Sequence, residues 1–223
     1  MSAPSSSGPD LSHVDTWLFD LDDTLYPAET ALMELIRGRI TLFVQKITGL
    51  EADAARAIQR GWFEEHGAAL PGLLAEHDVP PEEFLDFVHD VPLDRIPPDP
   101  ALDAALARLP GRRLVFTNGS AAHAERVLAR IGISDRFEDV FHIEAAGLVP
   151  KPAPATFDAL MSRHAVHPKT TAFFEDSERN LSHAAHLGMV TILVGAHAEA
   201  STAGFIHHRA AALTPFLQNL RFD

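Results

Sequence analysis

The spacing of apolar and polar residues changes near residue 97. Before that point, apolar residues recur at three- and four-residue steps, beginning with Leu32, Leu35 and Ile36. This spacing is typical of amphipathic helices, and no segment of the block has the pattern of a strand. The helices are expected at 32–47, 53–65, 70–76 and 81–89. We therefore predict that residues 28–96 form an all-helical insertion, which ends at the proline-rich stretch 97–100.

In the rest of the chain, short apolar runs alternate with helical patterns. Unbroken apolar runs suit strands that are buried on both faces, as in parallel sheets. Strands built on such runs are expected at 17–19, 113–116, 171–174 and 190–194, with a weaker one at 140–143. Such alternation predicts an α/β fold with a doubly wound, Rossmann-like parallel sheet. The expected core domain comprises residues 16–27 and 97–223, and the helical insertion interrupts it.

Composition and charge narrow the class of protein. The formal net charge of −13 argues against a nucleic-acid polymer or an anionic membrane as partner. The absence of cysteine excludes disulfides, thiolate zinc sites and a thiol nucleophile. No apolar run approaches the ~20 residues of a membrane helix. The start of the chain is rich in Ser and Pro, and we expect residues 1–15 to be a disordered tail, not a signal peptide. These features indicate a soluble, cytoplasmic protein.

Functional groups follow three of the predicted strands. Asp20 ends the first run, Thr117 the second, and Glu175 with Asp176 a third. The carboxyl ends of parallel strands share one edge of a sheet, where ligands bind. We therefore expect these side chains to meet there, together with Asp22. Clustered carboxylates without Cys or grouped His favour Mg²⁺ over zinc.

Two further segments suit a phosphate group. The Thr117 hydroxyl and the Asn118 backbone N–H precede a helix start, where phosphate oxygens bind well. Lys151 lies between prolines, so its ammonium would be held in position. Taken singly, each feature has an ordinary explanation: Asp22 to Thr24 as a turn or helix cap, Thr117 to Ser120 as a turn, and Lys151 as a solvated loop lysine. Their order along the chain favours a shared site.

These motifs, in this order, resemble the haloacid dehalogenase superfamily of phosphohydrolases. The matching motifs are Asp20-Leu21-Asp22-Asp23-Thr24, Thr117-Asn118-Gly119, Lys151-Pro152 and Glu175-Asp176-Ser177, and the resemblance covers Trp17 to about Val194. Shorter segments are similar to the pyrimidine 5′-nucleotidase branch: Leu25-Tyr26-Pro27, Val88-His89-Asp90, Pro98-Asp99-Pro100 and His123-Ala124. The resemblance implies that the helical insertion is a cap domain over an active site.

The resemblance also implies a role for each motif residue. Asp20 would be the nucleophile that forms an aspartyl-phosphate, and Asp22 would be the general acid and base. Mg²⁺ would be held by Asp20, the Asp22 backbone carbonyl and Asp176, with Glu175 helping directly or through water. The phosphate-binding groups would be Thr117, the Asn118 N–H and Lys151.

Substrate residues are harder to assign, and we consider Tyr26, Trp62, Phe63 and His66. Trp62 and Phe63 could stack on a nucleobase, or they could be core aromatics of the insertion. The branch usually has a basic or polar residue and a tyrosine where this chain has Glu64 and His66. His66 is alternatively a surface residue.

The sequence therefore predicts a Mg²⁺-dependent phosphomonoester hydrolase acting on a small phosphorylated metabolite, with a pyrimidine nucleoside 5′-monophosphate as the favoured substrate. The alternatives are a phosphatase of a sugar phosphate or a phosphoglycolate-like metabolite, a phosphomutase, and a phospho-accepting module like a receiver domain. A dehalogenase is disfavoured because halide displacement by Asp20 does not need the acid/base group of Asp22.

Overall fold

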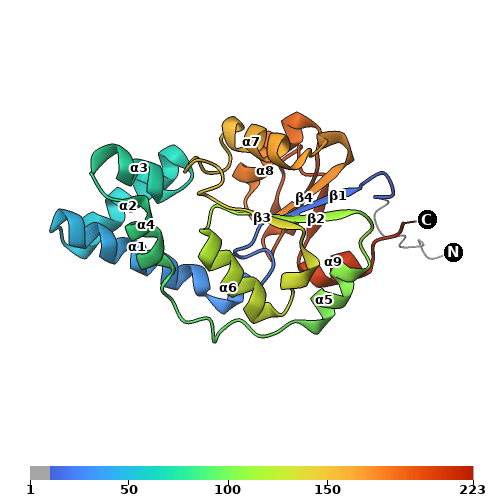
Figure 1. Cartoon of the computed structure of the whole chain (residues 1–223), viewed down its shortest axis with the longest axis horizontal. Coiled ribbons are helices and arrows are strands. Elements are labelled where there is room, and N and C mark those ends of the chain that lie inside the picture. The colour runs from blue at the N-terminus through green and yellow to red at the C-terminus, as the bar shows by residue number, and fades with distance from the viewer. Residues whose placement is uncertain (1–10, 223) are drawn as a thin grey trace.

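A parallel sheet of six strands forms the centre of the molecule (Figure 1). The computed structural model describes residues 11–222. The strand order is β3-β2-β1-β4-β5-β6, and every neighbouring pair is parallel. The strands are β1 (Thr16–Phe19), β2 (Arg112–Phe116), β3 (Asp139–Phe141), β4 (Thr171–Glu175), β5 (Val190–Val194) and β6 (His208–Ala210). The predicted doubly wound α/β fold is confirmed.

Helices cover both faces of this sheet (Figure 1). One face packs against α5 (Pro100–Ala107), α6 (Ala121–Ile131) and α9 (Leu213–Gln218), and the other against α7 (Pro154–His164) and α8 (Glu178–Leu187). Side chains along β1 alternate between the faces: Trp17 and Phe19 join the first cluster, and Leu18 joins the second. Both faces are therefore apolar, which explains the unbroken hydrophobic runs in the sequence. Short 3₁₀ turns occur at Ala28–Thr30, Ser134–Arg136, Pro168–Thr170 and Ala198–Ala200.

Four α-helices lie between β1 and α5, in the segment 28–96 that we expect to be a helical insertion. Its helices are α1 (Leu32–Thr48), α2 (Ala52–His66), α3 (Ala69–Glu76) and α4 (Pro81–His89), and they lie together at one end of the molecule (Figure 1). They enclose a separate hydrophobic cluster that includes Phe43 and Val44 of α1. The first turns of α1 instead pack on the sheet, through Leu32 and Ile36. Helix α1 thus belongs to both cores.

The order of the strands determines where a site can form. From β1 the chain moves outward through β2 to β3, and it then returns to add β4, β5 and β6 on the other side of β1. The direction of winding reverses between β1 and β4. Ligands bind beyond the carboxyl ends of strands at such a switch point. Asp20 follows β1 there, and Glu175 is the last residue of β4.

The predicted disordered tail over residues 1–15 is wrong for its last part. Leu11 and Val14 are 2% and 3% exposed and belong to the hydrophobic cluster on one face of the sheet. Two apolar residues give too little periodicity to reveal this from sequence. Residues 1–10 lie outside the described part of the chain.

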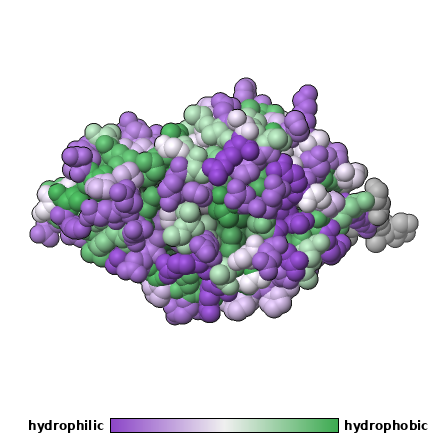
Figure 2. Space-filling model, viewed as in Figure 1, coloured by the Kyte–Doolittle hydropathy of each residue, from purple (hydrophilic) through white to green (hydrophobic). Residues whose placement is uncertain are grey.

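The surface is mixed in character. On the face seen in Figure 2, hydrophilic residues cover most of the sheet domain, and hydrophobic residues reach the surface over the helical insertion. The exposed large hydrophobic residues of the insertion are Leu42, Leu50 and Phe63. Between residues 11 and 222, no helix is long and apolar enough to cross a lipid bilayer.

Candidate active site

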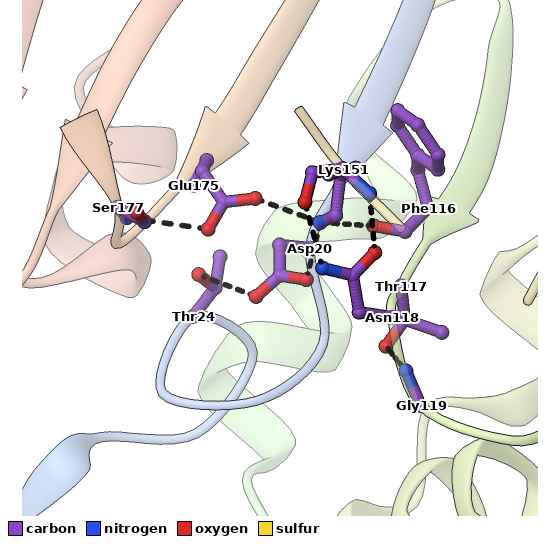
Figure 3. A network of polar contacts seen from close by, with 9 residues as sticks. All are labelled: Asp20, Thr24, Phe116, Thr117, Asn118, Gly119, Lys151, Glu175 and Ser177. Atoms are coloured by element: carbon purple, nitrogen blue, oxygen red, sulfur yellow. Dashed lines mark hydrogen bonds and ion pairs between the residues drawn. The ribbon is translucent and has the colours of Figure 1, made fainter. Parts of the chain in front are cut away.

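Asp20 and Lys151 form a buried ion pair at the carboxyl end of β1. Lys151 Nζ lies 2.7 Å from Asp20 Oδ1, although 131 positions separate the two residues in sequence. The same ammonium donates to Glu175 Oε2 and to the Phe116 carbonyl, each at 2.7 Å (Figure 3). Lys151 is 0% exposed, so it is not the solvated loop lysine that its sequence context allowed.

The charge of Lys151 is maintained by these partners. Burial disfavours an ammonium, but the attraction of Asp20 and Glu175 outweighs it and raises the Lys151 pKa. The rings of Phe116 and Phe173 lie 5.0 and 5.3 Å from Nζ. The negative faces of these aromatic rings also attract a cation. Lys151 is therefore a fixed positive charge beside Asp20.

Three carboxylates meet beside this ammonium. Asp20, Glu175 and Asp176 each offer an oxygen within 4.8 Å of the others. Burial, and then repulsion from Glu175, raises the pKa of Asp20 to about 8. Burial raises the pKa of Glu175 to about 8 and that of Asp176 to about 6. Such a cluster is costly to ionise, and its donors are all oxygens, so these residues fit a hard divalent cation such as Mg²⁺.

Thr117 and Asn118, the two phosphate-binding candidates at the end of β2, use their side chains in hydrogen bonds to loop backbone. Thr117 Oγ1 accepts a 2.8 Å hydrogen bond from the Gly119 N–H (Figure 3). The side chain of Asn118 accepts from the Lys151 N–H at 2.7 Å and donates to the Lys151 carbonyl at 3.3 Å. The Asn118 side chain thus ties the β2 loop to the Lys151 loop. Its backbone N–H remains the group that we expect to bind phosphate.

Asp22 is not one of the three clustered carboxylates and has its own hydrogen-bond partners. Its Oδ1 accepts from the Tyr26 hydroxyl at 2.6 Å and lies 2.8 Å from His123 Nε2. Burial opposes its charge, but attraction to His123 and these hydrogen bonds lower the Asp22 pKa to about 2. An ionised carboxylate only accepts, so His123 Nε2 carries a proton. Tyr26, a substrate candidate from the sequence, is instead buried and bound to Asp22.

A second histidine, His89, stacks on His123. The rings of His89 and His123 are stacked, with centroids 4.4 Å apart, and His89 Nδ1 lies 3.1 Å from Ser120 Oγ. Burial, and then repulsion from His123, lowers the His89 pKa to about 3. His89 belongs to the insertion and His123 to α6, so this stack crosses between the two parts. Sequence reasoning assigned no role to either ring.

Asp23 does more than form the turn or helix cap that the sequence allowed for Asp22 to Thr24. Its backbone has a left-handed φ of 59°. Within residues 11–222 its Oδ1 is buried without a hydrogen-bond partner. Burial, and then repulsion from Asp22, raises its pKa to about 6. The loop after β1 therefore concentrates more unbalanced negative charge than the sequence motif alone indicated.

The proposed substrate aromatics of α2 separate into different environments. Trp62 is 4% exposed and belongs to the core of the insertion, where its Nε1 donates to Glu76 at 2.8 Å. Its assignment as a substrate residue is therefore corrected to a core role. Phe63 is 55% exposed and lines a cavity. His66 is half-buried, with Nε2 3.8 Å from Glu65.

This cavity, of about 410 Å³, lies between the helical insertion and the carboxyl end of the sheet. Asp20, Asp22, Thr117, Asn118 and Asp176 are among the sheet-side residues that line it. Three arginines that sequence reasoning missed also line it: Arg37, Arg60 and Arg179. No local pattern marks these arginines as cavity residues, because a charge on the polar face of a helix is usually solvated.

Arg179 joins the sheet domain to the insertion. Its guanidinium donates to the carbonyls of Phe63 and Glu64, at 2.9 and 3.0 Å, at the C-terminal end of α2. A cation there also complements the helix dipole. Gly67, which ends α2 with a φ of 84°, comes so close to Lys151 that a Cβ would lie 2.8 Å from its carbonyl oxygen. The end of α2 is thus held against the Lys151 loop.

Comparison with known families agrees with this geometry. The model of the haloacid dehalogenase-like hydrolases matches residues 14–188. The chain belongs to this family. The match includes every motif residue from Asp20 to Asp176 and the whole helical insertion. The match thus covers strands β1 to β4 and the segment inserted after β1.

Two curated relatives in this family bear names connected with phosphate. Phosphate metabolism protein 8 of Saccharomyces cerevisiae is 26% identical over 189 residues, covering 78% of this chain and 59% of the yeast protein. The glyceraldehyde 3-phosphate phosphatase of Methanopyrus kandleri is 30% identical over 197 residues, covering 79% of this chain and 82% of that protein. The chain thus spans under two thirds of the yeast protein's length.

Solved structures of the family share the fold. The L-2-haloacid dehalogenase RSc1362 superposes with a TM-score of 0.62 at 17% identity, covering 92% of this chain and 97% of that chain. A phosphatase from Thermococcus onnurineus gives 0.60 at 18% identity, covering 89% and 94%. The putative hydrolase YfnB from Bacillus subtilis, bound to magnesium, gives 0.60 at 15% identity, covering 92% and 97%. Dehalogenases and phosphatases share this architecture, so the side chains must distinguish the two reactions.

Proposed function

We propose that this protein is a phosphomonoester hydrolase that works through an aspartyl-phosphate on Asp20. The observation that carries the proposal is the contact of Asp20 with Lys151 at 2.7 Å, inside a cluster of three carboxylates. A carboxylate attacks phosphorus when nearby positive charge offsets the repulsion between nucleophile and phosphate. Lys151 supplies one such charge.

Asp22 would transfer the protons in both steps of this reaction. An oxygen of Asp20 attacks phosphorus, the bond to the leaving oxygen breaks, and Asp22 gives that oxygen a proton. Water then attacks the phosphorus of the aspartyl-phosphate, Asp22 takes the proton of the water, and Asp20 and inorganic phosphate are released. The arrival of an anionic phosphate beside Asp22 favours its protonated form, because like charges repel. In the free protein, its two hydrogen-bond donors keep it ionised.

The carboxylate cluster supports a requirement for Mg²⁺. Asp20, Asp176 and the Asp22 backbone carbonyl would hold the ion, with Glu175 helping directly or through water. The bound cation would draw negative charge off the phosphoryl oxygens. Thr117, the Asn118 N–H and Lys151 would hold the phosphate group in the same region.

For the substrate, we propose a pyrimidine nucleoside 5′-monophosphate. Phe63 supplies an aromatic surface in a cavity of a size common for small-molecule sites. The helical insertion would then act as a cap that excludes water and selects the leaving group. A small sugar phosphate is the second candidate, because the relative at 30% identity is named as a glyceraldehyde 3-phosphate phosphatase.

The direct test is phosphate release with Mg²⁺ from uridine 5′-monophosphate, cytidine 5′-monophosphate, glyceraldehyde 3-phosphate and phenyl phosphate. We expect sustained turnover and the highest kcat/KM with a pyrimidine nucleotide. Asp20→Asn should lower turnover roughly a thousandfold or more while the circular dichroism spectrum stays unchanged. A single stoichiometric phosphorylation would instead indicate a receiver-like module, a retained phosphorylated product a phosphomutase, and halide release from a 2-haloacid a dehalogenase.

A further inference from the structure

The cavity beside Asp20 has two chemically different ends. The sheet side carries the acidic residues and the groups proposed to bind phosphate. The insertion side is formed by α1, through Met33, Ile36, Arg37 and Ile40, and by α2, through Gln59, Arg60 and Phe63. These positions follow helical spacing on each element, so each helix turns one stripe toward the cavity. A phosphomonoester bound at the sheet side would extend its leaving group toward these stripes.

Two arginines, Arg37 and Arg60, line the insertion side of the cavity. Within residues 11–222, the guanidinium groups of Arg37 and Arg60 make neither a hydrogen bond nor an ion pair. Other arginines of the insertion are engaged: Arg39 donates to the Phe87 carbonyl, and Arg56 pairs with Asp53. Arg179, the third arginine of the cavity, is held by the carbonyls at the end of α2. Donors are thus left free on the side of the cavity that faces a leaving group.

These two cations lie in a protein, and beside a site, in which negative charge predominates. The chain carries a net charge of −13, and the sheet side of the cavity is formed by Asp20, Asp22, Asp23, Glu175 and Asp176. Arg37 attracts the Asp23 carboxylate electrostatically, from across the cavity. None of the residues by which α2 lines the cavity, Gln59, Arg60 and Phe63, is acidic. A guanidinium in that position suits an acceptor that enters with a ligand.

Phe63 adds an apolar surface next to Arg60. The two residues are three positions apart on α2, so they share one side of the helix. Phe63 is 55% exposed, whereas the neighbouring Trp62 is buried in the insertion's core. An aromatic ring and a guanidinium on one helix face suit a group that is planar or apolar on its face and carries oxygen acceptors at its edge.

We propose that Arg60, assisted by Arg37, binds an oxygen acceptor on the leaving group of the substrate, and that Phe63 covers the face of that group. This inference rests on the proposed phosphatase function, because it assumes that the phosphate lies at Asp20. Two sources share the required chemistry: the carbonyl edge of a nucleobase, and a carboxylate on a small metabolite. In both, recognition of the leaving group depends on donors from α1 and α2, separate from the phosphate-binding groups.

The test compares substrates that share the phosphate and differ in the acceptor. Uridine 5′-monophosphate carries base carbonyls, 2-phosphoglycolate carries a carboxylate, and phenyl phosphate carries neither. We expect Arg60→Gln to lower the kcat/KM of an acceptor-bearing substrate, relative to phenyl phosphate, by roughly tenfold or more, with a smaller effect of Arg37→Gln. The matched control is Arg56→Gln, one turn earlier on α2, which should leave the ratio unchanged.

The outcomes separate the inference from the function on which it rests. Loss of selectivity for uridine 5′-monophosphate alone identifies a nucleobase acceptor, and loss for 2-phosphoglycolate alone identifies a carboxylate. An unchanged ratio in both arginine variants overturns the inference while the phosphatase proposal stands. If no substrate releases phosphate, the proposed function fails. Calorimetric Kd values for the three compounds in an Asp20→Asn background then still test Arg60, because the same loss of selectivity must appear in binding.

Discussion

His123 Nε2 lies 2.8 Å from Asp22 Oδ1, and the same carboxylate oxygen accepts from the Tyr26 hydroxyl. These two donors come from α6 and from the loop after β1, and together they fix the orientation of the carboxylate. A group proposed to move protons is thus oriented by residues that do not contact phosphorus. His123 and Tyr26 are positioning residues in this scheme.

The first prediction follows from that contact. His123→Ala should lower kcat roughly tenfold to a hundredfold, because Asp22 loses one donor and its fixed orientation. The loss of a donor also raises the Asp22 pKa from about 2 toward its ordinary value, so the limb of the pH–rate profile that Asp22 controls should move to higher pH. His123→Gln retains an amide N–H that can replace Nε2 and should recover part of the rate. An alanine variant with normal kcat and pH profile would contradict this role.

The buried ammonium of Lys151 should be essential for stability. Lys151→Met leaves Asp20 and Glu175 together without a countercharge, and we expect a loss of about 3–5 kcal/mol of unfolding free energy. The pKa of both acids is already raised to about 8, above the value of about 4 in an unfolded chain. The folded state therefore binds more protons between those limits, and stability falls as pH rises through that window. Urea denaturation from pH 5 to 8.5 should show a steeper fall in the variant.

A compensating change provides the control for Lys151→Met. Glu175→Gln in the same chain removes one of the two unpaired charges, so the double variant should regain part of the lost stability, mainly at the alkaline end. An equal loss at every pH in both variants would show that packing, not charge, determines the role of Lys151.

Removal of Mg²⁺ should have a pH-dependent effect. Carboxylate ligands must lose their protons before they bind a metal. Because the pKa values of Asp20 and Asp176 are raised to about 8 and about 6, the rise in Tm caused by Mg²⁺ should be larger at pH 8 than at pH 6. Differential scanning calorimetry with Mg²⁺ or a chelator measures this. Asp176→Asn should remove most of the Mg²⁺ effect, and Asp158→Asn, at an exposed position on α7, should not.

Arg179 should control how firmly the insertion is held. Arg179→Gln loses the hydrogen bonds to the Phe63 and Glu64 carbonyls, and we expect KM to rise roughly threefold to tenfold with little change in Tm. Arg163→Gln, an exposed arginine on α7, is the matched control. An unchanged KM in Arg179→Gln would mean that the end of α2 is held by its other contacts with the Lys151 loop.

The site residues that could be predicted from the sequence are those at the ends of the predicted strands. Asp20, Thr117 and Glu175 could be predicted to converge because each lies at the carboxyl end of a buried parallel strand, and parallel strands align their carboxyl ends. The assignment of Trp62 failed because helical spacing alone does not say which stripe of α2 faces the insertion's core and which faces the cavity. The answer depends on how α2 packs against α3, where a Cβ on Gly72 would lie 2.1 Å from the Trp62 ring.

Charged and coupled groups were harder to predict. Arg60 has the same local pattern as a solvated arginine, and only the position of α2 over the sheet brings it to the cavity. His123 lies 101 positions from Asp22, and the contact depends on where α6 begins after β2. Such contacts arise from tertiary structure, so neither periodicity nor local spacing contains them.

Helix α1 has a practical consequence for engineering. Its first turns are anchored on the sheet through Leu32 and Ile36, and its later turns belong to the insertion through Phe43 and Val44. A chimera that receives this segment from another family member should be spliced after Ile36, within the helix, and not at the loop near Pro27. A junction at the loop would replace side chains that complete the hydrophobic layer beneath β1, and the recipient scaffold would lose stability before any new specificity could be measured.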